Sequence, residues 1–318
     1  MSGAEGGGGS HGESTGAILA AFLANMGIAV TKFVGFLITG SSSLLAESIH
    51  SVADSSNQGL LFLGGKRAAR PATNLHPFGF GRSRYFWSFV VAIVLFSAGG
   101  LFAIYEGWHK ISHPEEIDSP AIAVAILVVA MIFESFALRT AIRHARPFRG
   151  ERSWMAFIRR SRSPELPVLL VEDSAAITGL AFALAGVVLA VVTGEPVFDG
   201  IGTLAIGVLL VVVGIFLAIE MQSLLLGEAA VEEQQAAIRE AADGVPEIAR
   251  IVHVLTQHLS PDDLLVAMKV DFAPGLSAAD AGRVIDDCEA RIRAAVPIAT
   301  RIYVEPAAPQ ESVTGTAG

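Results

Sequence analysis

One face of the stretch 44–58 carries polar side chains of the kinds that bind metal ions and move protons. They are spaced three, four and three residues apart, which places them in line along one side of a helix: Glu47, His50, Asp54 and Asn57. An ionisable side chain in hydrocarbon costs roughly 3 kcal/mol or more, so such residues mark a pathway or a site. A histidine and an aspartate one turn apart can also bind one small cation together. We therefore predict that this face forms half of a metal-ion transport site.

A second pair of carboxylates interrupts the apolar stretch 166–192, where Glu172 and Asp173 are adjacent. Neighbouring positions on a helix diverge by about 100°, so only one of the two is expected to face the centre shared with His50 and Asp54. A divalent ion bound by His50, Asp54 and Asp173 would have its charge balanced by two carboxylates, which makes these groups tolerable in lipid.

The ligand types indicate the ion. One histidine with carboxylates suits Zn²⁺, and also Mn²⁺, Co²⁺ or Fe²⁺, whereas the lack of a thiolate argues against Cu⁺. The alternative is that these acids pair with cationic side chains between helices, with Lys32 as the obvious partner, and the two interpretations can coexist. Glu134 is the deepest of the remaining acids, and a proton relay and an interhelical hydrogen bond are both open for it. No phosphate-binding loop or nucleophile motif occurs, so neither an enzyme nor a required cofactor is predicted.

These residues must be positioned by membrane-spanning helices. The chain of 318 residues is 52% hydrophobic and only 17% charged. A helix needs about 20 apolar residues to cross a bilayer. Stretches of this length are predicted at 16–40, 42–65, 85–111, 120–142, 166–192 and 198–227. We thus expect an all-α six-helix transporter domain over residues 16–227.

Charge between the spans predicts the topology. The connections 66–84 and 139–162 are basic, and the latter holds eight arginines against one acid. Basic loops stay in the cytoplasm, which places both termini there as well. The segment 139–165, with its scattered aromatic residues, reads either as an amphipathic helix on anionic lipid or as a cytoplasmic loop that sets topology, and we favour the loop.

The chain after the last predicted span has the pattern of a small soluble domain. We expect helices over 232–243 and from a cap at Ser277 to 294, and strands over 248–258, 264–272 and 301–304. This αββαβ order over 228–306 predicts an α+β domain of ferredoxin-like type. From residue 227 onward the net charge is −8, so nothing indicates nucleic-acid binding. Residues 1–15 and 307–318 are expected to be loose tails.

Five stretches together resemble the cation diffusion facilitator family, in particular its zinc-transporter-nine-like branch: GSSSLLAESIHSVAD (40–54), HPFGFGRSRYFW (76–87), LLVEDSAAITG (169–179), VFDGIGTLAIGVLL (197–210) and SLLLGEAA (223–230). The resemblance implies a homodimeric, proton-coupled exporter of divalent cations with ligand pairs on spans two and five. His50 and Asp54 match the first pair and Asp173 matches half of the second. Its other half is Leu169, so the resemblance leaves Glu172 or a water molecule to complete the ligand shell.

We therefore predict a proton-coupled efflux transporter for a divalent cation, with Zn²⁺ first, in which proton and metal compete for the lone pair of a histidine. The alternative is a membrane-anchored metal sensor or assembly protein without transport of its own. The composition, rich in Ala, Gly and Arg, favours a bacterial inner membrane.

Overall fold

The computed structural model describes residues 10–307, with side chains described from Asn25 onward except that of Phe96. Of the tails predicted at 1–15 and 307–318, residues 1–9 and 308–318 lie outside the described residues. The chain divides into two compact units. The first comprises the chain up to Ala68 together with Ser83–Gln222, and the second comprises Ala69–Arg82 together with the chain from Ser223 onward.

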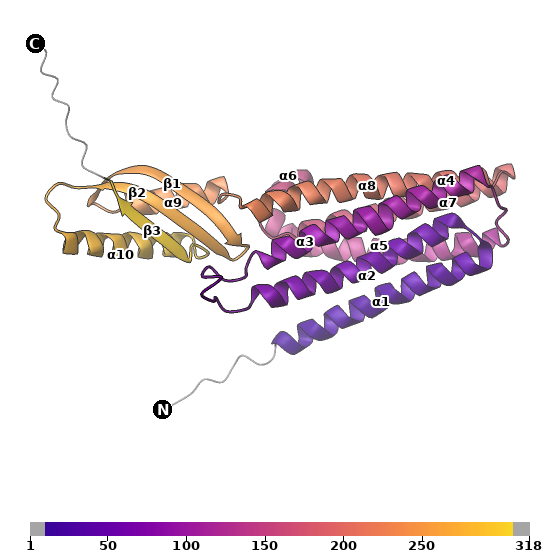
Figure 1. Cartoon of the computed structure of the whole chain (residues 1–318), viewed down its shortest axis with the longest axis horizontal. Coiled ribbons are helices and arrows are strands. Elements are labelled where there is room, and N and C mark those ends of the chain that lie inside the picture. The colour runs from indigo at the N-terminus through magenta and orange to yellow at the C-terminus, as the bar shows by residue number, and fades with distance from the viewer. Residues whose placement is uncertain (1–9, 308–318) are drawn as a thin grey trace, which may run out of the picture. The chain divides into compact units, whose positions relative to one another are not determined.

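The first unit is built from long helices that run side by side (Figure 1). In chain order they are α1 (Ser10–Thr39), α2 (Ser42–Ala68), α3 (Ser83–Val94), a π-helical stretch (Leu95–Leu101), α4 (Phe102–Ser112), α5 (Pro120–Arg149), α6 (Trp154–Arg160), α7 (Glu165–Thr193) and α8 (Val197–Leu226). Because α3, the π-helical stretch and α4 follow one another without a break, they form the third of six long helical segments within residues 10–307. The predicted all-α helical fold is confirmed.

Four of these segments are long and apolar enough to cross a membrane: 83–112, 120–149, 165–193 and 197–226. The part of α1 whose side chains are described, Asn25–Thr39, is a shorter apolar helix. Helix α2 differs because serine and ionisable residues replace hydrocarbon along it, and many of them are buried, including Glu47, His50 and Asn57. Helix α2, which carries the predicted ligands His50 and Asp54, is thus less apolar than α7 and α8.

Helix α2 packs against α1, α3, α4 and α7, so its polar face is enclosed by other helices. Its first turn is held by a residue far away in the sequence. The carboxylate of Asp199, at the start of α8, accepts hydrogen bonds from Ser41 Oγ (2.9 Å) and from the backbone N–H of Ser42 (2.9 Å). A carboxylate at a helix N-terminus accepts hydrogen bonds from the free N–H groups there and is attracted by the positive end of the helix dipole. This contact fixes the start of α2 against α8.

Glycines let helices α4 and α8 approach closely. A Cβ atom at Gly107 would lie 2.5 Å from the backbone nitrogen of Leu204, and one at Gly207 would lie 2.5 Å from that of Ile104. Small residues at such contacts are the usual means of close helix packing in lipid. The glycine-rich spans therefore have a direct packing role.

The basic segment after the fourth apolar stretch is more helical than predicted. Helix α5 continues to Arg149, seven residues beyond the expected end at 142, and α6 follows at Trp154. Alanine and arginine are strong helix formers, which explains the extension. Phe157 of α6 is buried against Ala141 and Ala145 of α5. The expected loop is therefore largely a helix with a short packed helix after it. Likewise, α1 begins at Ser10, inside the stretch expected to be a loose tail.

The second unit has the predicted αββαβ order: α9 (Glu232–Asp243), β1 (Ile248–Ser260), β2 (Asp263–Phe272), α10 (Ala278–Ala295) and β3 (Arg301–Pro306). The sheet order is β1-β2-β3, with β1 antiparallel and β3 parallel to β2. Alternate residues of β2, Leu264 to Val270, face the buried sides of α9 and α10. Ser277 caps α10 through the backbone N–H of Asp280, as the sequence predicted.

Candidate metal site

The pair on α2 has the geometry that its spacing predicts. His50 Nδ1 lies 3.5 Å from Asp54 Oδ1, and the His50 side chain is 1% exposed. Neither ring nitrogen of His50, nor Asp54 Oδ1, has a hydrogen-bond partner among the described residues. Buried polar atoms are normally paired, because an unpaired one costs about 1–3 kcal/mol. The pair thus offers nitrogen and oxygen lone pairs to a cation.

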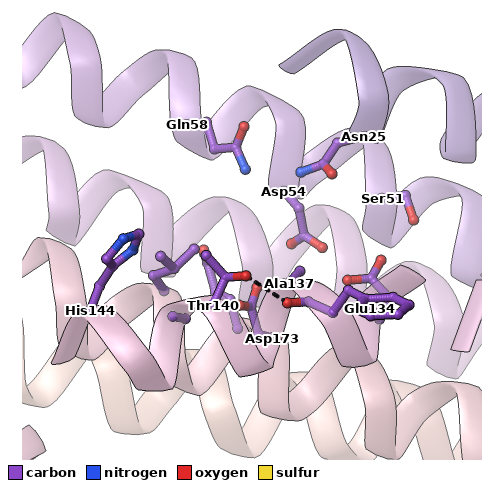
Figure 2. Close-up of a pocket in the computed structure, with 13 residues that line it drawn as sticks. Asn25, Ser51, Asp54, Gln58, Glu134, Ala137, Thr140, His144 and Asp173 are labelled. Atoms are coloured by element: carbon purple, nitrogen blue, oxygen red, sulfur yellow. Dashed lines mark hydrogen bonds between the residues drawn. The ribbon is translucent and has the colours of Figure 1, made fainter. Parts of the chain in front are cut away.

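A cavity of about 370 Å³ lies beside this pair. Figure 2 shows acidic side chains from three helices directed into it: Asp54 from α2, Glu134 from α5 and Asp173 from α7. Its other lining residues are Asn25, Ser51, Gln58, Phe136, Ala137, Thr140, Ala141, His144, Leu169 and Glu172. The cavity extends from the middle of α2 and α5 toward the ends that carry Lys66 and Arg149.

The structure brings Asp54 and Asp173 to one cavity although they lie at different depths along their helices. Asp173 is eight residues after the start of α7 at Glu165, and Asp54 is 14 residues before the end of α2 at Ala68. The six-residue difference amounts to about 9 Å at 1.5 Å per residue. Helix α2 extends farther beyond the cavity than the start of α7 does, and this extension, which carries Lys66 and Arg67, accounts for the difference.

Glu172 is held differently from Asp173. Its Oε1 accepts a hydrogen bond of 2.7 Å from the side-chain amide of Asn57, and the residue is 5% exposed. Although Glu172 borders the cavity, this bond ties α7 to α2 and occupies one of its two oxygens. Asn57, on the predicted polar face of α2, therefore contacts a carboxylate.

Glu47, the other end of that face, is paired with Lys32 of α1. The ammonium of Lys32 lies 3.0 Å from Glu47 Oε2 and donates to Ser51 Oγ at 2.8 Å, and both charged side chains are buried. Glu47 Oε1 points at Gly179 of α7, where a Cβ would lie 2.7 Å away. The alternative interpretation, that Lys32 pairs with a carboxylate, is thus found at Glu47.

The predicted ligands do not form a complete coordination shell in this structure. Among the described residues no three His, Cys, Asp or Glu side chains stand close enough together to hold an ion. His50 and Asp54 are in contact, while Asp173 lines the same cavity as Asp54. Leu169, the position without a ligand, also lines the cavity. Binding an ion between α2 and α7 therefore requires rotation of side chains that have room to move.

Glu134 is the residue whose role the sequence left open. It stands alone on an apolar helix, so no spacing rule links it to His50 or Asp54. Its only sequence signal is a carboxylate deep in a predicted span. Packing of α5 along α7 brings it to the cavity.

In the second unit, His258 and Asp263 of the β1–β2 hairpin make contacts within the domain. His258 Nδ1 lies 3.2 Å from the carbonyl oxygen of Ser260, and Asp263 contacts Thr300 and Arg301. Within the described part of this unit no group of three potential ligands gathers. This geometry offers no support for a metal site there.

Apolar helices that enclose ionisable side chains, followed by a small α+β domain, define an integral membrane protein of the transporter class. The family comparisons agree. The model of the cation efflux transmembrane domain matches residues 18–226, and that of the cation efflux protein cytoplasmic domain matches residues 230–307. The chain therefore belongs to the cation efflux family, which confirms the resemblance drawn from its motifs.

Similar proteins include transporters named for zinc. The chain is 33% identical over 245 residues to the mitochondrial proton-coupled zinc antiporter SLC30A9 of Homo sapiens, covering 76% of this chain and 43% of that protein. It is 26% identical over 258 residues to metal tolerance protein C4 of Arabidopsis thaliana, covering 80% of this chain and 56% of that protein. It is 26% identical to the magnetosome protein MamB of Paramagnetospirillum magneticum, covering 90% of this chain and 92% of that protein. The chain thus spans less than half the length of the human relative.

Proposed function

We propose that this chain exports a divalent cation, with Zn²⁺ as the first candidate and Mn²⁺, Co²⁺ and Fe²⁺ as others, in exchange for protons. One observation carries the proposal: Asp54 of α2 and Asp173 of α7 line one cavity inside a bundle of apolar helices, and the buried His50 of α2 lies 3.5 Å from Asp54. Membership of the cation efflux family and similarity to a protein named as a proton-coupled zinc antiporter support it.

In the proposed mechanism, His50, Asp54 and Asp173 bind the ion, and Glu172 supports the site through Asn57 or supplies a further oxygen. The cavity runs toward the basic ends of α2 and α5. By the positive-inside rule these ends face the cytoplasm, which would place both termini there and make the cavity the inward access path. Outward release would then require α2 and α7 to open at their other ends. Protons compete for the same lone pairs of His50 and the carboxylates, which couples the two fluxes.

We further propose a homodimer formed through the second unit. Leu255, Ala267 and Tyr303 lie side by side across β1, β2 and β3, on the sheet face away from the helices. Leu255 is 64% and Tyr303 is 57% exposed, an unusual exposure for large apolar and aromatic residues in neighbouring positions. For the location we propose a bacterial inner membrane, on the composition of the chain.

Flux through proteoliposomes tests the transport proposal. Purified protein is reconstituted with a Zn²⁺-sensitive dye inside the vesicles, and a pH gradient is imposed. Wild type should move Zn²⁺ against its own gradient, and Asp54→Asn should not. Asp118→Asn, which makes the same change at an exposed position between α4 and α5, should transport like wild type. Equal flux through wild type and Asp54→Asn would refute the assignment.

A further inference from the structure

The wall of the cavity formed by α7 holds Glu172, which is tied to Asn57, one further carboxylate and one hydrocarbon side chain. Asp173 and Leu169 lie one helical turn apart and both line the cavity. His50, Asp54 and Asp173 alone would give an ion three protein ligands, whereas a tightly held Zn²⁺ is usually four-coordinate. A further donor on another element would complete this set.

Helix α5 brings such a donor into the same space. Figure 2 shows the Glu134 side chain directed into the cavity that Asp54 and Asp173 also face. No hydrogen bond or ion pair to another described residue engages its carboxylate. A carboxylate kept in a membrane helix without a protein partner is expected to serve an ion or a proton.

The histidine in contact with Asp54 points to a cation as the ligand. His50 is 1% exposed and both of its ring nitrogens lack hydrogen-bond partners among the described residues, as does Asp54 Oδ1. Glu134, one of the four acids at this cavity, thus shares it with Asp54, which contacts a histidine whose buried lone pairs have no partner among the described residues.

Glu172 is the less suitable donor. It follows a direction about 100° away from that of Asp173 on the same helix. Its Oε1 already accepts the 2.7 Å hydrogen bond from Asn57, and recruiting that oxygen for an ion would leave a buried amide unpaired.

We propose that Glu134 is the ligand that replaces the one missing at Leu169, so that the transported cation is bound by His50, Asp54, Asp173 and Glu134. This proposal rests on the proposed transport function. The ligand set has one nitrogen and three carboxylates, and it is therefore richer in oxygen than two histidine–aspartate pairs. Oxygen-rich sets favour harder ions, so Glu134 also determines how strongly the site prefers Zn²⁺ over Mn²⁺.

Equilibrium binding of Zn²⁺ alone to the purified full-length chain tests the proposal, with a chromophoric chelator as competitor. Glu134→Gln should weaken binding at least about tenfold, since even residues that only orient metal ligands cost that much. Glu172→Gln should weaken binding less than Glu134→Gln does, because an amide can keep a bond to Asn57. The matched control is Glu106→Gln in α4, a carboxylate outside the cavity, which should bind like wild type.

A rescue variant separates loss of a ligand from loss of the fold. Adding Leu169→Asp to Glu134→Gln restores a carboxylate to the cavity and should recover most of the affinity, whereas Leu169→Asn, of the same size, should not. In addition, Glu134→Gln with Leu169→His should raise the ratio of Zn²⁺ to Mn²⁺ affinity above that of wild type, because imidazole replaces an oxygen donor.

The outcomes distinguish this inference from the transport proposal. If Asp54→Asn loses Zn²⁺ binding while Glu134→Gln binds like wild type, the role of Glu134 is refuted and the transport site stands. If Glu134→Gln loses binding and Leu169→Asp restores no more than Leu169→Asn, the ligand role is likewise refuted. If Asp54→Asn binds like wild type, the transport site itself is refuted.

Discussion

The buried pair of Lys32 and Glu47 offers the sharpest test of the packing around α2. Replacing Lys32 by methionine keeps most of the side-chain volume but removes the ammonium that lies 3.0 Å from Glu47 Oε2. Glu47 is 0% exposed and its Oε1 has no other partner among the described residues, so its charge would be left buried and unpaired. Removing one partner of a buried ion pair costs about 3–5 kcal/mol.

That cost predicts a large change in thermal stability. For a unit of about 200 residues, each kcal/mol shifts Tm by roughly 2–4 °C, so Lys32→Met should lower Tm by about 6–20 °C. The double variant Lys32→Met with Glu47→Leu removes both charges. It should recover most of that loss, because replacing a whole buried pair by apolar side chains is often nearly neutral.

The measurement is unfolding of the detergent-purified protein followed by tryptophan fluorescence. All variants are heated at one scan rate, because membrane proteins seldom unfold reversibly. A Tm for Lys32→Met within 2–3 °C of wild type, or a double variant less stable than the single one, would contradict the reasoning. Either result would mean that the pair is exposed to water or is not formed.

Three further predictions concern other parts of the chain. Asp199→Asn removes the charge that caps α2 and should cost about 1–3 kcal/mol, seen as a lower Tm than that of Asp118→Asn. Gly207→Ala forces a Cβ to within 2.5 Å of backbone and should destabilise by about 1–3 kcal/mol, whereas Gly65→Ala, with nothing within 4 Å, should not lower Tm. Burial raises the pKa of Cys288 from 9.0 to about 11, so its alkylation in the folded protein should keep accelerating up to about pH 11, while in the unfolded chain it should level off near pH 9. Because the folded pKa is the higher one, this thiol stabilises the fold below pH 9, and that contribution is lost as the pH rises through 11. A rate that levels off near pH 9 in the folded protein would contradict the burial of this thiol.

Local rules of the chain determined much of the fold. Apolar stretches of span length predicted the long helices, and the alternation of apolar and polar residues predicted β2. The contact of His50 with Asp54 also follows from the sequence, because residues four apart on a helix lie on one face however that helix packs against others. The cap at Ser277 was also predictable from the sequence, because a serine followed three residues later by an acid can form a capping box.

Relations between helices depended on the tertiary structure. The rotation of α7 about its axis decides that Asp173 faces the cavity while Glu172 meets Asn57, and adjacent residues give no sign of that rotation. The bond from Ser41 to Asp199 spans 158 positions, beyond the reach of any periodicity. Glu134 is the clearest case. The sequence determined that a carboxylate lies deep in an apolar helix, and only the packing of α5 along α7 decided that it faces Asp54, because the direction of a side chain between helices is set by how their surfaces fit together.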